Sequence, residues 1–89
     1  MEQTFVRNLF VRHRAIRGAM YLVKNYNTYA VNSVGEKIWE ALDEHGTIIS
    51  LVDSLTSDYP DVPIEKLRDD VTLFINALLQ AGLIEKTTP

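Results

Sequence analysis

The feature that most constrains this chain is a long apolar stripe at helical spacing near its C-terminal end. The stripe occupies residues 64–81, where apolar side chains recur every three or four positions. Its members are Ile64, Leu67, Val71, Phe74, Leu78 and Ala81, with Ile75 and Leu79 widening it. This spacing predicts an amphipathic helix with Pro63 in its first turn and Gly82 at its end. At 89 residues, the chain has room for one domain with a small core.

Two shorter helices are predicted before this one. Ser33 and Glu36 have capping-box spacing, and Gly46 can close the helix that they begin. The apolar residues of that helix are Val34, Ile38, Trp39, Ala41 and Leu42. Thr47 is the expected cap of the second helix, and the pair Tyr59-Pro60 ends it because a residue before proline avoids the α conformation. The apolar face of the second helix is Ile48, Val52 and Leu55.

The first third of the chain has the pattern of β-strands. Residues 9–16 mix apolar and basic side chains with no helix-start signal, and Arg17-Gly18 breaks the run. Residues 20–24 and 28–32 are two further short strands, separated by a turn at residues 25–27, where asparagine tolerates positive φ. The prediction is an α+β fold of order βββααα, with a small three-stranded antiparallel sheet packed on three helices. Leu83-Ile84 is expected to fold back as an apolar tail.

Charge and composition limit the function further. The chain has no cysteine, which excludes a disulfide framework and a thiolate zinc site and leaves the redox compartment open. It also has no apolar run long enough to span a membrane and no signal peptide, and we expect a cytoplasmic protein with no membrane partner. Residues 1–30 hold five basic side chains and one acidic, a net charge of +4. Residues 31–89 hold four basic side chains and eleven acidic, a net charge of −7. The predicted domain therefore has a basic first part and an acidic second part.

The residues needed for catalysis are not grouped in the sequence. His13 and His45 stand alone, with no partner at metal-ligand or nucleophile spacing. Asp69 and Asp70 are neighbours on a helix, so their side chains diverge. The glycines are scattered rather than gathered in a phosphate-binding loop. We expect no enzyme activity, no metal and no cofactor.

Two kinds of binding remain. Three helices beside a hairpin also compose a winged helix-turn-helix DNA-binding regulator, but the acidic second and third helices would be repelled by phosphates. The second candidate is an open sheet edge, to which an extended peptide adds as a further strand beside the third helix. Residues such as Val71, Phe74 and Leu78 fit either a groove or the core. Tyr29 is also open to both interpretations.

The ordered set of segments resembles the PqqD-like proteins, also called RiPP recognition elements. The resemblance spans roughly residues 5–85 and rests on short motifs. They are Tyr21-Leu22-Val23, Tyr29-Ala30-Val31-Asn32, Lys37-Ile38-Trp39, Gly46-Thr47-Ile48, Leu67-Arg68-Asp69-Asp70-Val71 and Ala81-Gly82-Leu83-Ile84. The family usually has Thr-Ala after the asparagine, where this chain has Val34-Gly35.

The resemblance implies a winged-helix-like module that binds the leader of a ribosomally made precursor peptide. In this family the leader adds to the third strand, in a cleft closed by the third helix. Carried over, the peptide-binding residues are Thr28, Tyr29, Ala30, Val31 and Asn32 on the strand, and Leu67, Arg68, Val71, Phe74 and Ile75 on the helix. Lys66 and Arg68 are candidates to pair with an acidic residue of the leader.

The resemblance also implies a partner enzyme, because the chain itself is expected to hold the leader and perform no chemistry. That partner is a radical-SAM protein if the precursor belongs to PQQ synthesis, or a leader protease if it belongs to a lasso-peptide cluster. A DNA-binding regulator is the alternative function, although no nucleic acid is expected on charge grounds. A homodimer paired through the sheet edge is a third possibility.

Overall fold

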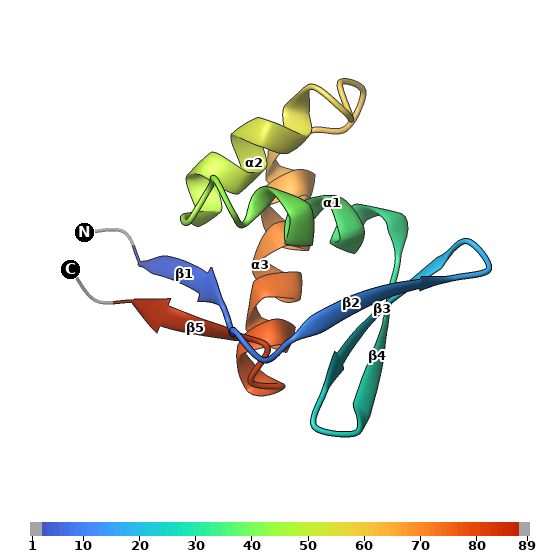
Figure 1. Ribbon diagram of the computed structural model, residues 1–89. Helices are drawn as coiled ribbons and strands as arrows, with labels where there is room; N and C mark the ends of the chain where they lie inside the picture. The colour runs from blue at the N-terminus through green and yellow to red at the C-terminus, as the bar shows by residue number, and fades with distance from the viewer. Residues whose placement is uncertain (1–2, 88–89) are drawn as a thin grey trace.

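The computed structural model describes residues 3–87 and contains two antiparallel sheets and three helices (Figure 1). In chain order the elements are β1 (Thr4–Arg7), β2 (Arg12–Ile16), β3 (Ala19–Lys24), β4 (Asn27–Val31), α1 (Ser33–Ala41), α2 (Ile48–Thr56), α3 (Ile64–Gln80) and β5 (Ile84–Thr87). One sheet has the order β2-β3-β4, and the other pairs β1 with β5. The predicted α+β architecture of a three-stranded sheet and three helices is confirmed. None of the helices within residues 3–87 is long and apolar enough to cross a membrane.

Two tight turns produce the three-stranded sheet. Arg17 and Gly18 join β2 to β3 with φ values of 52° and 82°. Asn25 and Tyr26 join β3 to β4 with φ values of 53° and 68°. Positive φ at both central residues belongs to the type I′ turn, whose twist matches that of paired strands. The predicted turn at residues 25–27 is therefore one residue shorter, and Asn27 already pairs with β3.

The strand predicted at residues 9–16 begins later than expected. Leu9 and Phe10 lie in a turn, and β2 starts at Arg12. The turn is fixed because the side-chain oxygen of Asn8 accepts a hydrogen bond from the Phe10 amide at 2.8 Å. An Asx bond of this kind competes with the sheet ladder.

The pairing of β1 with β5 was not predicted from the sequence. The tail at Leu83 and Ile84 does fold back and is buried, but residues from Ile84 onward also pair with β1, from Thr4 opposite Thr87 to Arg7 opposite Ile84. Each strand is only four residues long. The β1–β5 ribbon places both ends of the described chain side by side (Figure 1).

The helix starts differ from the prediction at one place and agree at another. Asn32, not Ser33, caps α1, because its side-chain oxygen accepts a hydrogen bond from the Gly35 amide at 2.8 Å. Ser33 is the first helical residue, and α1 ends well before Gly46. Thr47 caps α2 as predicted, in a reciprocal capping box with Ser50.

The end of α3 follows the predicted pattern. Gly82 has a φ of 74°, and its amide donates to the Leu79 carbonyl at 3.1 Å. The Leu83 amide donates to the Leu78 carbonyl at 2.9 Å, which completes a Schellman motif. The Lys24 ammonium donates to the Gly82 carbonyl at 2.9 Å and ties the end of β3 to the end of α3.

One arginine joins the β1–β5 ribbon to the helices. Arg7 donates from Nε to the Trp39 carbonyl at 3.0 Å and makes a second bond from Nη2 to the same oxygen. Its guanidinium lies 4.8 Å from the centre of the Trp39 ring and 3.1 Å from an Asp43 oxygen. Two hydrogen bonds and a cation–π contact on a half-buried side chain make Arg7 a structural residue of α1.

Replacing Arg7 by alanine is expected to lower the free energy of unfolding by about 1–2 kcal/mol, because the Trp39 carbonyl and ring lose their partner. Urea denaturation followed by circular dichroism measures the change. The matched control is Arg12→Ala, an exposed arginine at the start of β2, for which we expect a change within about 0.5 kcal/mol. Equal losses from the two variants would show that Arg7 has no special role.

Candidate functional site

β4 is an edge strand with one side open. It pairs with β3 only, and Asn27, next to the two-residue turn, occupies a hydrogen-bonded position. Hydrogen-bonded and non-hydrogen-bonded positions alternate along an antiparallel pair, so Tyr29 and Val31 also bond to β3. Thr28 and Ala30 therefore direct their backbone N–H and C=O groups away from the sheet. These groups are the ones that a further strand would use.

The two faces of β4 differ in what they contact. Tyr29 lies opposite Leu22, and Val31 lies opposite Met20. Because Leu22 and Met20 are buried, Tyr29 and Val31 point toward the core beside α3, and both are half-buried. Thr28 and Ala30 alternate with them and are exposed on the outer face of the sheet.

A groove lies between β4 and α3. It has a volume of about 280 Å³ and an apolar floor and walls. The residues that line it are Leu22, Tyr29, Ala30, Val31, Asn32, Phe74, Ala77, Leu78, Ala81 and Leu83. A strand added to β4 would direct alternate side chains into this groove.

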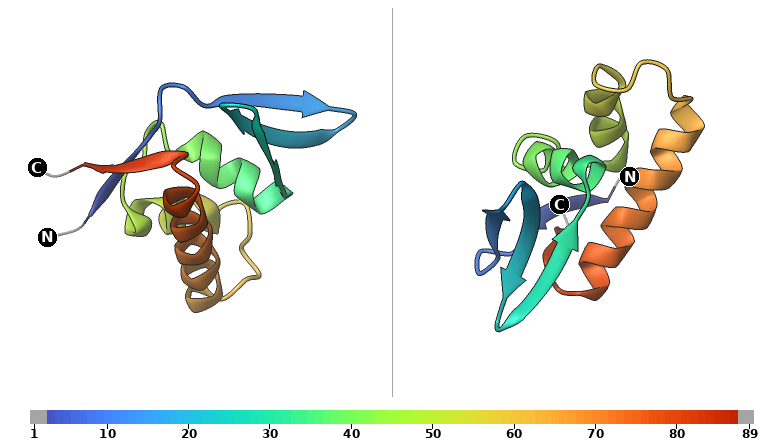
Figure 2. Two further views of the ribbon diagram at one scale, coloured as in Figure 1. Left: turned by 90° about the horizontal axis from the view of Figure 1, so that it is seen from below. Right: turned by 90° about the vertical axis from the view of Figure 1, so that its right-hand side faces the viewer.

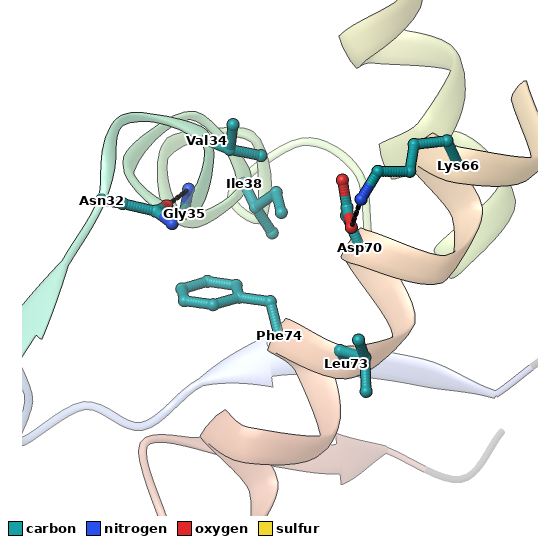
Figure 3. Close-up of a pocket in the computed structure, with 8 residues that line it drawn as sticks. All are labelled: Asn32, Val34, Gly35, Ile38, Lys66, Asp70, Leu73 and Phe74. Carbon is teal, nitrogen blue, oxygen red and sulfur yellow. Dashed lines mark hydrogen bonds and ion pairs between the residues drawn. The ribbon is translucent and has the colours of Figure 1, made fainter. Parts of the chain in front are cut away.

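A second hollow of about 480 Å³ lies between α1 and α3 (Figure 3). Its lining residues are Asn32, Val34, Gly35, Ile38, Lys66, Asp70, Leu73 and Phe74. Asn32 and Phe74 line both hollows, so the two meet at these side chains. We call the two hollows together the composite groove. The composite groove runs along β4 and continues past the start of α1.

The Phe74 ring closes the junction of the two hollows by packing against Gly35 (Figure 3). A Cβ atom at Gly35 would stand 2.8 Å from Cε1 of Phe74 and 2.7 Å from Cγ1 of Val31. Both distances are shorter than real contacts, so only glycine allows Phe74 and Val31 to approach α1 this closely. The shape of the groove at this junction therefore depends on glycine at position 35.

The charged side chains that line the composite groove, Lys66 and Asp70, both belong to α3 and line the hollow between α1 and α3. Lys66 Nζ lies 2.9 Å from Asp70 Oδ1, and the two residues are separated by four positions on the helix. The hydrogen bond that Lys66 donates to Asp70, together with the negative charge of that carboxylate, raises the pKa of Lys66. The lysine therefore stays protonated and can meet an acidic group of a ligand. Within residues 3–87, no three His, Cys, Asp or Glu side chains gather closely enough to hold a metal ion.

The structure separates the ten predicted peptide-binding residues into two groups. Of the five on the strand segment, all but Thr28 line the groove, and Thr28 and Ala30 present their backbone to the open edge. On the helix, Phe74 lines both hollows. Leu67, Val71 and Ile75 are at most 2% exposed, so they are core residues under the groove wall. Arg68 is exposed but lines neither hollow.

The α3 wall of the groove contains apolar residues outside the stripe as well as the stripe residues Phe74, Leu78 and Ala81. Leu73 and Ala77 were missed, and Leu73 is 69% exposed. Successive residues on a helix are turned by about 100°, so positions that flank the stripe face the gap beside β4. An exposed leucine off the stripe was the available sequence signal.

Replacing Gly35 by alanine is expected to displace the Phe74 ring and alter the groove with little loss of stability. The close atoms belong to the ends of side chains, and alanine favours a helix by about 0.5–1 kcal/mol over glycine. Nuclear Overhauser contacts between Phe74 and Val31 measure the displacement. Gly46→Ala is the control, since its Cβ would meet nothing closer than 3.5 Å. An unmoved ring in Gly35→Ala would contradict the expectation.

Two comparisons with known proteins give a match for this chain. The family model of coenzyme PQQ synthesis protein D (PqqD) matches residues 19–84. The chain is also similar to a solved structure described as TbiB1 in complex with the TbiA(beta) leader peptide. That likeness has a TM-score of 0.79 at 22% identity, over 94% of this chain and 99% of that chain, and shows a shared fold. No curated protein is matched by this sequence. Because the family model covers most of its length, the chain belongs to the PqqD family.

Proposed function

We propose that this protein binds the leader segment of a ribosomally made precursor peptide and holds it for a separate maturation enzyme. The leader adds to β4 as a fourth strand and places side chains in the composite groove, which is called the leader groove from here on. The observation that carries the proposal is the open edge of β4, which lies directly beside an apolar groove. The PqqD family match and the fold shared with a leader-bound protein support it.

The two edges of the sheet differ in a way that favours β4 as the docking edge. β2 carries Arg12 and Arg14, and arginine or lysine on an edge strand discourages pairing with other strands. β4 has the sequence Asn-Thr-Tyr-Ala-Val and carries no charge. An uncharged edge next to an apolar groove lacks that protection, which fits an edge that pairs in the course of its function.

The energetics require both the edge and the groove. Each backbone hydrogen bond contributes about 0.5–1.5 kcal/mol net, and ordering a flexible peptide cancels much of that gain. Apolar side chains entering the groove supply the rest at about 25 cal/mol per Å² of buried apolar surface. The edge therefore recognises any extended peptide, and the groove selects among peptides by their side chains.

The protein contributes binding and no chemistry of its own. Holding the leader near the enzyme raises the local concentration of the precursor core without any new contact to the core. The precursor belongs to PQQ or lasso-peptide synthesis in the cytoplasm, and the enzyme is a radical-SAM protein in the first case or a leader protease in the second. The acidic α2 and α3 count against the DNA-binding alternative, since α2 carries Asp53 and no basic residue.

Replacing Ala30 by proline is expected to weaken leader binding at least about tenfold, because it removes an N–H group that an added strand would use. The fold should persist, since this N–H points away from β3. The affinity is measured by isothermal titration with a synthetic leader, whose sequence is taken from a short precursor found by reading the neighbouring genes. Backbone amide shifts in the same titration should concentrate in residues 28–32 and 66–81.

Ala15→Pro is the matched control for Ala30→Pro. Ala15 is also exposed and occupies the equivalent non-hydrogen-bonded position on β2, the other edge of the same sheet. Its affinity for the leader should match that of the wild type. Equal weakening by both variants, or none by either, would contradict strand addition to β4. If the molecular mass of the wild type rises to that of a dimer with protein concentration, and that of Ala30→Pro does not, the result would indicate self-pairing instead.

Replacing Leu73 by aspartate is expected to weaken leader binding about tenfold, because it places a charge on the apolar wall of the hollow between α1 and α3. Leu73 is 69% exposed, so the fold should tolerate the change. Ile49→Asp on α2 is the control, at a position that is 57% exposed and outside the groove. Unchanged affinity in Leu73→Asp would limit the leader to the groove beside β4.

A further inference from the structure

The three-stranded sheet is free of acidic side chains. Residues 12–32 include Arg12, Arg14, Arg17 and Lys24 and contain no Asp or Glu. The segment that holds α1, α2 and α3, residues 33–82, contains ten acidic and three basic residues. The protein therefore has two surfaces of opposite charge, and the basic one lies on the sheet.

The arginines of this sheet have no structural task within residues 3–87. The ion pairs of that part of the chain involve Arg7, Lys37 and Lys66, while Lys24 binds the Gly82 carbonyl. All five residues of β2 are exposed, including Arg12 and Arg14, and Arg17 is exposed in the turn that follows. The β2–β3 hairpin extends away from the helices (Figure 2).

An apolar pair precedes this strand and is held in place. Leu9 is 95% exposed and Phe10 is 77% exposed. Asn8 fixes their turn: its amide donates to the Leu83 carbonyl at 3.0 Å, and its carbonyl accepts from the Val11 amide at 3.2 Å. Its side chain accepts from the Phe10 amide and donates to Glu85 at 2.7 Å. Exposed apolar residues on a rigid turn lose little conformational entropy when they bind a partner.

We propose that Leu9, Phe10, Arg12, Arg14 and Arg17 form a second docking surface, here called the basic face, for a protein partner. The partner has acidic side chains around a shallow apolar recess: the acids pair with the arginines, and the recess receives Phe10. Phe10 lies within about 7 Å of Arg12 along the chain, so one partner surface reaches both. Aromatic and arginine side chains are the residues that most often dominate protein interfaces.

The basic face and the leader groove have no residue in common. The face belongs to β2 and its flanking turns, the groove belongs to β4, α1 and α3, and β3 separates the two edge strands. Both surfaces can therefore be occupied at once. The identity of the partner rests on the proposed function: it is the maturation enzyme that acts on the bound precursor.

Two other occupants fit the basic face less well. A second copy of β2 would place arginines against arginines, and like charges on adjacent strands destabilise pairing. Nucleic acid would use the arginines through its phosphates, but it would leave the ordered Leu9–Phe10 turn without a role. The acidic α1, α2 and α3 would also repel it.

The test compares charge-reversal and apolar variants in binding to a radical-SAM protein or leader protease found by reading the neighbouring genes, at about 50 and 300 mM NaCl. Arg12→Glu/Arg14→Glu should weaken binding at least about tenfold at low salt and flatten the salt dependence. Phe10→Ser should weaken binding about tenfold and leave the salt dependence unchanged. Lys37→Glu/Lys86→Glu, which changes net charge equally at exposed sites away from the face, should stay within about twofold of wild type.

The leader titration is repeated on the same variants to separate the two proposals. Unchanged leader affinity together with lost enzyme binding supports the basic face. Enzyme binding that is undetectable in the wild type, or equal in all variants, overturns it. Binding of a DNA duplex that is lost in Arg12→Glu/Arg14→Glu overturns it in favour of nucleic acid. If the leader does not bind while the enzyme does, the basic face stands and the proposed function fails.

Discussion

The buried stripe of α3 is the constraint from which the rest of the structure follows. α1, α2 and β5 all pack on this helix, and Leu67, Val71 and Ile75 have almost no exposed surface. Burying a side chain of this kind stabilises the fold by about 1.5–3 kcal/mol, a large contribution in a domain with so small a core. Phe74 at the margin of the stripe, and Leu73 and Ala77 beside it, are left to line the hollows next to β4 and α1. The leader groove lies there because the core has already taken the central face of the helix.

Whereas the stripe of α3 must be buried, the two edges of the three-stranded sheet stay open and must do so without causing aggregation. Both outer strands have backbone groups with no partner in the sheet, but they differ in side chains. β2 carries arginines, whereas β4 is uncharged and lies beside an apolar groove. Strand addition and protection against unwanted strand pairing are thus assigned to different strands. The charge asymmetry visible in the sequence is an asymmetry between two edges of one small sheet.

Local rules predicted the local structure well and the long-range structure poorly. Thr47 as a cap, Gly82 as a helix end and the turn at Asn25 each depend on a few neighbouring residues, and the structure contains all three. The β1–β5 ribbon has no such signal, because its four-residue strands pair only when the helices bring them together.

The site shows the same division between local and long-range information. Periodicity identified the apolar side of α3, and the family resemblance supplied the strand edge. Neither showed which apolar residues a neighbouring element covers, so Leu67 and Val71 were assigned to the groove although they are core. Gly35 seats Phe74 only because β4, α1 and α3 converge there, and that contact depends on three segments at once.

The β1–β5 ribbon also orders the events of folding. The hairpins around β3 close over two-residue turns and form within microseconds, whereas Thr4 and Thr87 are 83 positions apart. Closing so long a loop is entropically costly until the helices have docked. The ribbon is therefore a late step, and interactions formed late mainly govern how fast the native state opens. Arg7, which joins the ribbon to α1, therefore slows unfolding and has little effect on the rate of folding.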